Sequence, residues 1–170
     1  MPALIQHPDC RSAAVTAIDA DAERTGGVLR LRYRLIGRTE AVLVPAPAYP
    51  ERADDLWRHT CFEAFVRGAL DDGYCEFNFS PSTQWAAYAF TGYRAGMRNF
   101  EVSALECATD VGDGWLELSA VVRPGAAGVW RIGLSAVIEE TSGAKSYWAL
   151  AHPPGKPDFH HASGFVLEAP

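Results

Sequence analysis

The chain has 170 residues, of which 48% are hydrophobic and 21% are charged, a composition typical of globular proteins. At this length, folding buries roughly 70% of the surface that the unfolded chain exposes, so we predict one domain over residues 1–170. The formal net charge of −6 argues against nucleic acid as a partner, because neutralising phosphates requires a basic surface.

Alternation of apolar and polar residues predicts short strands along the first half of the chain. Residues 28–35 alternate between arginine and leucine or tyrosine, the pattern of a strand with one solvated face. Residues 41–44 predict a second short strand, and residues 9–23 hold a weak helix signal. Three further alternating segments joined by turns predict a β-meander over residues 61–66, 74–80 and 85–90.

The second half of the chain repeats this pattern. Residues 115–122 and 130–138 alternate over their whole length, and shorter strands are expected at 147–151 and 165–167, with a loop over 153–163. Eight or more short strands separated by turns predict an all-β fold, an antiparallel β-sandwich of the jelly-roll or immunoglobulin-like kind.

Polar and aromatic residues gather on strand faces opposite the predicted core. Glu63, Glu76 and Asn78 alternate away from phenylalanines on neighbouring strands, and Trp57 comes just before the first of these strands. Trp148 and His152 share a face near the end of the chain. Indole rings beside carboxylates and amides suit a sugar, whose apolar faces stack on aromatics while its hydroxyls exchange hydrogen bonds.

Several segments together resemble the bacterial DOMON-like domains, which are relatives of the family 9 carbohydrate-binding modules. The resemblance covers roughly residues 25–168, and it depends on the combination of residues 54–57 (DDLW), 60–65 (TCFEAF), 74–81 (YCEFNFSP), 147–149 (YWA) and 157–160 (PDFH). It implies a β-sandwich with a ligand site on one sheet face, in a superfamily whose members bind sugars or haem.

Carried onto this sequence, the resemblance implies that Trp57 is a stacking tryptophan and Glu63 a hydrogen-bonding acid. It implies that Trp148 is the second tryptophan of a clamp, and that Gln84 and Arg94 are near candidates for an arginine of those modules. We therefore predict a non-catalytic domain that binds a saccharide or saccharide-like small molecule through six residues: Trp57, Glu63, Glu76, Asn78, Trp148 and His152.

Two alternatives come from other classes of protein. A haem-binding domain would use a methionine and a histidine as axial ligands, for which Met97 and His160 are the candidates. A carbohydrate-active enzyme would use Glu63 with Glu76 as an acid/base pair, which requires carboxylates roughly 5–9.5 Å apart.

Metal and disulfide chemistry have less support. Residues 152–161 hold three histidines and an aspartate, but the adjacent His160 and His161 point to opposite sides of an extended segment, so we predict no metal site. The four cysteines form no Cys-x-x-Cys pair. No run approaches the ~18 apolar residues of a membrane span, and no signal-peptide pattern opens the chain. We expect four reduced cysteines, no membrane association and a cytoplasmic location.

Overall fold

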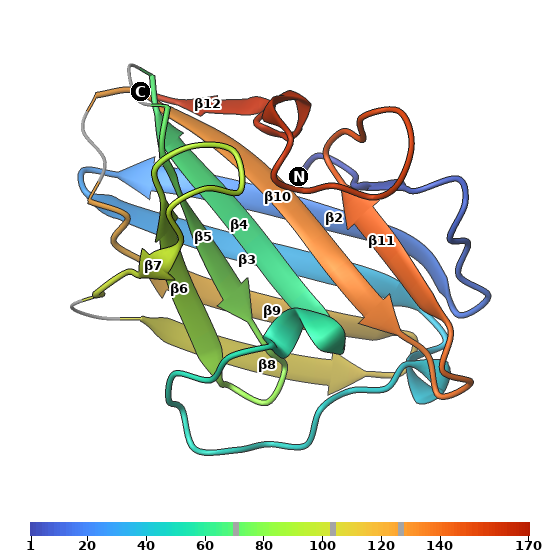
Figure 1. Ribbon diagram of the computed structural model, residues 1–170. Coiled ribbons are helices and arrows are strands. Elements are labelled where there is room, and N and C mark those ends of the chain that lie inside the picture. Colours follow the sequence, from blue (N-terminus) through green and yellow to red (C-terminus); the bar gives the residue numbers. More distant parts are fainter. Residues whose placement is uncertain (70–71, 103–104, 126–127) are drawn as a thin grey trace.

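The computed structural model describes residues 1–69, 72–102, 105–125 and 128–170, and in these residues two antiparallel sheets pack face to face (Figure 1). The larger sheet follows the order β1 (Ile5–Gln6), β11 (Lys145–Ala149), β10 (Trp130–Glu139), β4 (Cys61–Gly68), β5 (Tyr74–Phe79), β6 (Trp85–Phe90) and β7 (Arg98–Asn99), with β12 (Leu167–Ala169) paired to one end of β10. The smaller sheet follows the order β2 (Val15–Thr25), β3 (Val28–Gly37), β9 (Trp115–Val122) and β8 (Glu106–Gly112). The all-β sandwich prediction is confirmed.

The core lies between the two sheets and is built from the residues that alternate inward. Phe62 of β4 lies opposite Phe79 of β5, and both are fully buried. From the other sheet, the ring of Tyr33 packs 5.1 Å from that of Phe62, and its hydroxyl donates to the backbone carbonyl of Glu63 at 2.7 Å. This hydrogen bond ties the two sheets together and satisfies a polar group that burial would otherwise leave unpaired.

The outer face of the smaller sheet carries acidic and basic side chains at facing positions of neighbouring strands. Asp21 lies opposite Arg32 and Glu23 lies opposite Arg30 across β2 and β3. Opposite charges at directly facing positions stabilise an antiparallel pair by roughly 0.2–1 kcal/mol each. The arginines of β3 therefore form part of a solvated strand face, as their alternation predicts.

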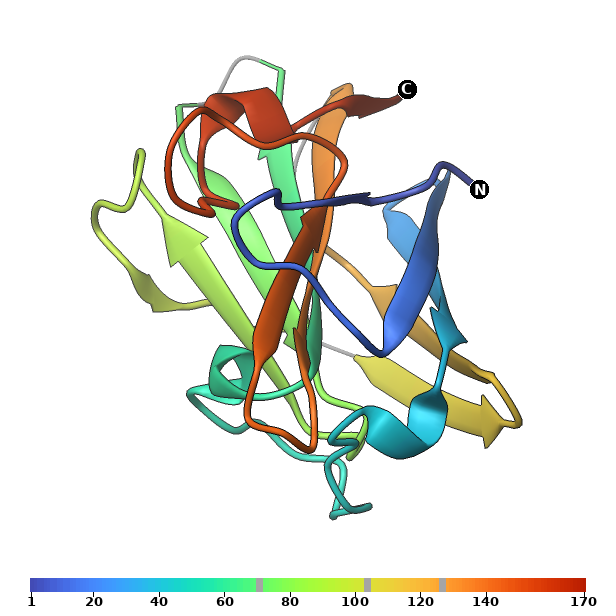
Figure 2. The same ribbon diagram turned by 90° about the vertical axis from the view of Figure 1, so that its right-hand side faces the viewer.

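The N-terminal segment joins the two sheets along one side of the sandwich. Ala3 forms a bridge with Asp19 of β2, and the amide of Ala20 donates to the carbonyl of Pro2 at 2.9 Å. Two residues further on, Ile5 of β1 pairs with Ala149 of β11 in the larger sheet. Figure 2 shows this side of the molecule, where the segment runs from β2 across to β11. We call residues 2–6 the seam.

The structure corrects several sequence predictions. Residues 9–23 hold no helix, and most of them form β2. Residues 41–44 hold no strand, because a short 3-10 helix, η1 (Thr39–Ala41), precedes a single bridge between Val42 and Glu140. The strands β1, β7 and β8 were not predicted. The last two strands are displaced from residues 147–151 and 165–167, because the structure places them at Lys145–Ala149 and Leu167–Ala169.

No helix among the described residues is long and apolar enough to span a membrane.

Candidate functional site

A cavity of about 600 Å³ lies on the outer face of the larger sheet, opposite the core. Strands β4, β5, β6, β7, β10 and β11 supply side chains to it. Three connecting segments add the rest: the short helix η2 (Leu56–Arg58) with the two residues before it, the loop between β6 and β7, and the loop that precedes η3 (Ala162–Gly164). Its lining combines carboxylates with aromatic rings, which are Asp54, Asp55, Glu63, Glu76, Trp57, Tyr88, Phe90, Tyr147 and Phe159.

Two glutamates on neighbouring strands form the polar part of the lining. Glu63 on β4 lies opposite Asn78 on β5, and Glu76 lies two residues before Asn78 on the same face. Loops cover this face of the sheet, so only 3% of Glu63 and 7% of Glu76 is exposed. The Asn78 amide donates to Oε1 of Glu76 at 2.8 Å, which holds one carboxylate oxygen in place.

Burial makes these carboxyl groups hard to ionise. The pKa of Glu63 lies well above its usual value, chiefly because the group is removed from water and secondly because Glu76 is close. Burial also raises the pKa of Glu76, against the hydrogen bond from Asn78 and the positive charge of Arg94. Two like charges in a poorly solvated space repel strongly, so the pair resists full ionisation.

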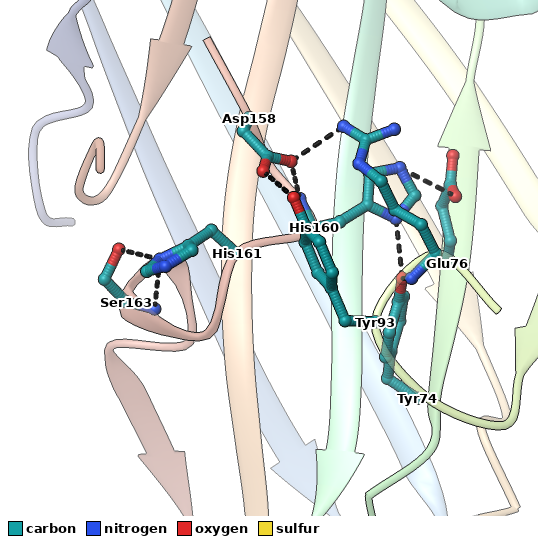
Figure 3. A network of polar contacts seen from close by, with 8 residues as sticks. Tyr74, Glu76, Tyr93, Asp158, His160, His161 and Ser163 are labelled. Carbon is teal, nitrogen blue, oxygen red and sulfur yellow. Dashed lines mark hydrogen bonds and ion pairs between the residues drawn. The ribbon is translucent and has the colours of Figure 1, made fainter. Parts of the chain in front are cut away.

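A hydrogen-bonded histidine stands beside the glutamates. The imidazole of His160 lies between Tyr74 and Glu76 (Figure 3), with Nδ1 2.7 Å from the Tyr74 hydroxyl and Nε2 3.7 Å from a Glu76 carboxylate oxygen. Burial, and next the positive charge of Arg94, lower the pKa of His160 to about 4. At neutral pH this imidazole is therefore uncharged and does not neutralise Glu76.

One ion pair connects the two loops at the rim of the cavity. The Arg94 guanidinium, from the loop after β6, lies 2.7 Å from a carboxylate oxygen of Asp158, in the loop before η3. The Tyr93 hydroxyl donates to the other oxygen of Asp158 at 2.5 Å. These hydrogen bonds, together with the positive charge, lower the pKa of Asp158 although its partial burial acts in the opposite direction. The positive charge of Arg94 is thus already matched within the protein.

A close backbone contact seats the C-terminal loop on the sheet. Gly133 of β10 faces outward, and a Cβ placed there would lie 2.9 Å from the carbonyl oxygen of Gly164. A larger residue at position 133 would push this loop away from the sheet. His161 then acts as the N-cap of η3, where its Nδ1 accepts a hydrogen bond from the Ser163 amide. The glycine and the cap together place His160 over β4 and β5 and Phe159 beside Tyr147 of β11.

Aromatic side chains form the walls of the cavity. Trp57 of η2 is 50% exposed, which leaves its indole accessible to a ligand. Tyr147 of β11 and Phe159 of the C-terminal loop lie with ring centroids 6.2 Å apart. Tyr88 donates its hydroxyl to Asp54 at 2.6 Å, so this ring is fixed by a carboxylate.

The structure brings together three of the six predicted site residues: Trp57, Glu63 and Glu76 all line the cavity. Asn78 is 1% exposed and lies outside the lining, where it supports Glu76. His152 also lies outside it, because its Nε2 is 2.8 Å from the Ile5 carbonyl and its ring packs edge-on against His7.

The prediction that Trp148 closes a clamp with Trp57 is wrong. Trp148 pairs with Ala136 of β10, which in turn pairs with Phe62, so its side chain points into the core. It is 4% exposed, and its indole nitrogen donates to Ser146 at 2.9 Å. Because strand residues alternate between faces, the preceding residue, Tyr147, faces the cavity instead.

Sequence reasoning missed four aromatic residues of the lining, Tyr88, Phe90, Tyr147 and Phe159, and it named Arg94 only as a near match beside Gln84. Arg94 lines the cavity and Gln84 does not. The alternation along β11 was a signal for Tyr147. Phe159 lies in an irregular loop, and no periodic pattern marks it.

The residues present do not make a haem site. Met97 and His160 both line the cavity, but both imidazole nitrogens face polar protein groups, the Tyr74 hydroxyl and the Glu76 carboxylate. Met97 is 62% exposed on the outer loop. Among the described residues, no group of three or more histidine, cysteine or acidic side chains is placed to hold a metal ion.

The sequence matches no protein-family model and no curated protein. Solved structures do share the fold. A protein from Bacteroides uniformis, described as a candidate carbohydrate-binding protein, superposes with a TM-score of 0.66 at 14% identity, over 87% of this chain and 75% of that one. A family 9 carbohydrate-binding module from Caldicellulosiruptor kristjanssonii, solved with cellotriose, superposes with a TM-score of 0.51 at 10% identity, over 84% of this chain and 70% of that one. At these identities the similarity establishes a shared β-sandwich.

Proposed function

We propose that this protein is a non-catalytic domain that binds a saccharide or saccharide-like small molecule in the cavity on the outer face of the larger sheet. The observation that carries this proposal is the exposed indole of Trp57 in the same cavity as the buried carboxyl groups of Glu63 and Glu76. An aromatic plane serves the apolar face of a pyranose ring, and the carboxyl groups accept hydrogen bonds from its hydroxyls in fixed directions.

The volume of the cavity and the structural neighbours support the proposal. A volume of about 600 Å³ lies in the range of small-molecule sites, which run from roughly 300 to 1,000 Å³. Both neighbours are described as carbohydrate-binding proteins, and one was solved with a sugar. We also propose a distant relationship to the bacterial DOMON-like domains and a cytoplasmic location.

The test is to titrate a panel of mono- and disaccharides against the wild type and Trp57→Ala, with isothermal calorimetry as the readout. Loss of a stacking indole should weaken binding by about 1–3 kcal/mol, or roughly five- to 150-fold. Trp115→Ala is the matched control, because Trp115 is a partly exposed tryptophan of β9 in the other sheet, outside the cavity.

Equal affinity in the wild type and Trp57→Ala would show that the ligand does not stack in this cavity. Failure of every sugar to bind the wild type would contradict the proposal itself. If the wild type hydrolysed a glycoside and Glu63→Gln did not, the protein would be an enzyme and not a non-catalytic binding domain.

A further inference from the structure

The charges around the cavity are unbalanced. Its lining carries four carboxyl groups, on Asp54, Asp55, Glu63 and Glu76, and one guanidinium, on Arg94. The rim carboxylates have partners within the protein, because Asp54 accepts the Tyr88 hydroxyl and Asp55 lies 3.4 Å from the Arg58 guanidinium. The Tyr88 hydroxyl carries no charge, but Asp54 and Asp55 are exposed to water, whereas Glu63 and Glu76 are buried. The poorly solvated negative charge therefore belongs to the two glutamates.

The two glutamates have no cation of their own. Among the residues that the structure describes, no lysine or arginine lies within 4.0 Å of either carboxylate. Arg94 acts on them only from a distance, since its guanidinium is bound to Asp158. The remaining neighbours are uncharged at neutral pH, namely the Asn78 amide, the Ser135 hydroxyl and the His160 imidazole.

A buried carboxyl group without a counter-charge is costly to ionise, and Glu63, at 3% exposure, is such a group facing an open cavity. A cationic ligand would supply the missing counter-charge and favour the ionised form of this group. We propose that the ligand carries a protonated amine, and that an amino sugar in its ammonium form is the class of compound that this cavity takes. This inference rests on the proposed saccharide function and narrows it to one class.

The geometry of the two strands suits an ammonium group. Glu63 and Glu76 lie on the same face of β4 and β5, at diagonal positions of an antiparallel pair, where backbone spacings are roughly 7–8 Å. An ammonium has three donors, so it can hydrogen-bond to both carboxylates and offset the repulsion between them. A neutral hydroxyl carries no charge to offset that repulsion.

The aromatic walls add a second source of selectivity. A cation within about 6 Å of an aromatic face is attracted by roughly 0.5–2 kcal/mol, more when water is excluded. Tyr88, Tyr147 and Phe159 line the cavity with the two glutamates and offer such faces. An N-acetylated sugar has lost the charge, and a uronic acid would meet carboxylates of its own sign.

The test compares sugars that differ only at one substituent, measured by calorimetry slightly below neutral pH. Glucose, glucosamine and N-acetylglucosamine are the first set, and the galactose and mannose counterparts repeat it for other ring stereochemistries. We expect the amino form of the best-fitting sugar to bind the wild type at least about tenfold more tightly than its hydroxyl and acetamido forms, or about 1.4 kcal/mol.

Two variants test whether the preference for the amino sugar depends on the carboxyl group of Glu63. Glu63→Gln keeps the shape and removes the charge, so the tenfold preference should fall to about threefold or less while the hydroxyl form still binds. Asp110→Asn removes an equal charge from an exposed position on β8 and should keep the preference. Thermal unfolding of Glu63→Gln should show an unchanged or raised Tm, which separates loss of the cation site from loss of the fold.

The outcomes separate this inference from the proposed function. Trp57-dependent binding without preference for the amine overturns the inference and leaves saccharide binding standing. Binding of spermidine, which has no sugar ring, as tightly as the best amino sugar overturns the amino-sugar assignment. If no compound in the panel binds, the inference and the proposed function fall together.

Discussion

The buried glutamate pair should make the protein less stable as pH rises, and Glu63→Gln should remove much of this effect. Both carboxyl groups have a raised pKa in the folded state, chiefly from burial, so the folded state binds more protons than the unfolded state. The contribution of the pair is then fully present below the unfolded pKa, near 4.5, and is lost as pH rises toward the folded pKa values.

The size of the effect follows from the same linkage. Each unit by which a folded pKa exceeds the unfolded one lowers the free energy of unfolding at high pH by about 1.4 kcal/mol. For one proton, the free energy of unfolding cannot change by more than about 1.4 kcal/mol per pH unit. Near pH 4 the side chain at position 63 is largely uncharged in the wild type, as it is in Glu63→Gln, so the two proteins should have similar free energies of unfolding. Above neutrality Glu63→Gln should be the more stable of the two.

The assay is urea unfolding followed by tryptophan fluorescence at a series of pH values, for the wild type, Glu63→Gln and Glu76→Gln. Glu106→Gln, an exposed carboxylate on β8, is the control and should follow the wild-type profile. Parallel profiles for the wild type and Glu63→Gln across the whole range would refute the reasoning. So would a wild type that gains stability relative to Glu63→Gln as pH rises.

Four other outcomes are expected. Trp148→Ala should lower the free energy of unfolding by about 3–5 kcal/mol, because the indole is buried in the core, whereas Trp57→Ala at an exposed site should cost much less; equal losses in urea unfolding would contradict the two placements. Tyr33→Phe should cost about 1–2 kcal/mol in the same assay by removing the hydrogen bond between the sheets. Gly133→Ala should displace the C-terminal loop and weaken ligand binding more than it lowers the Tm, as calorimetry and thermal unfolding would show. All four cysteines are free in the structure, so alkylation after denaturation without reductant should add four labels, and a protected pair would reveal a disulfide.

The sequence predicted the faces of the central strands because a strand residue alternates sides with period two. That rule alone placed Glu63 and Glu76 on one face and Phe62 on the other, and the structure agrees. The same rule also decides between Tyr147 and Trp148. The resemblance to a two-tryptophan clamp favoured Trp148, whereas strand pairing sends it inward.

The error over residues 9–23 has a local cause. The pairing of β2 with β3 shifts between Val15 and Ala17, so one extra residue interrupts the alternation. The buried positions then fall at Val15 and Ile18, a spacing of three that is typical of a helix. Pairing with β3 decides the outcome, and pairing between strands is not visible in a short window of sequence.

The cavity itself was beyond prediction because loops complete it. Arg94 and Asp158 are 64 residues apart and meet only when two loops fold over the outer face of the sheet. The contact that permits this, between Gly133 and Gly164, depends on the absence of a side chain and leaves no periodic pattern. Regular strands can be recognised in a sequence from the alternation of their residues, whereas the contact between two irregular segments depends on the whole fold.

The seam has a consequence for how copies of the protein meet. A strand at the end of a sheet presents unpaired backbone groups that readily extend into the sheet of another molecule, which is a common route to aggregation. Residues 2–6 occupy parts of two such edges at once, since Ala3 bridges to β2 and Ile5 pairs with β11. Local opening of this one short segment would expose unpaired backbone groups at the edges of both sheets at the same time. Protection against edge-to-edge association on this side of the sandwich thus depends on these five residues.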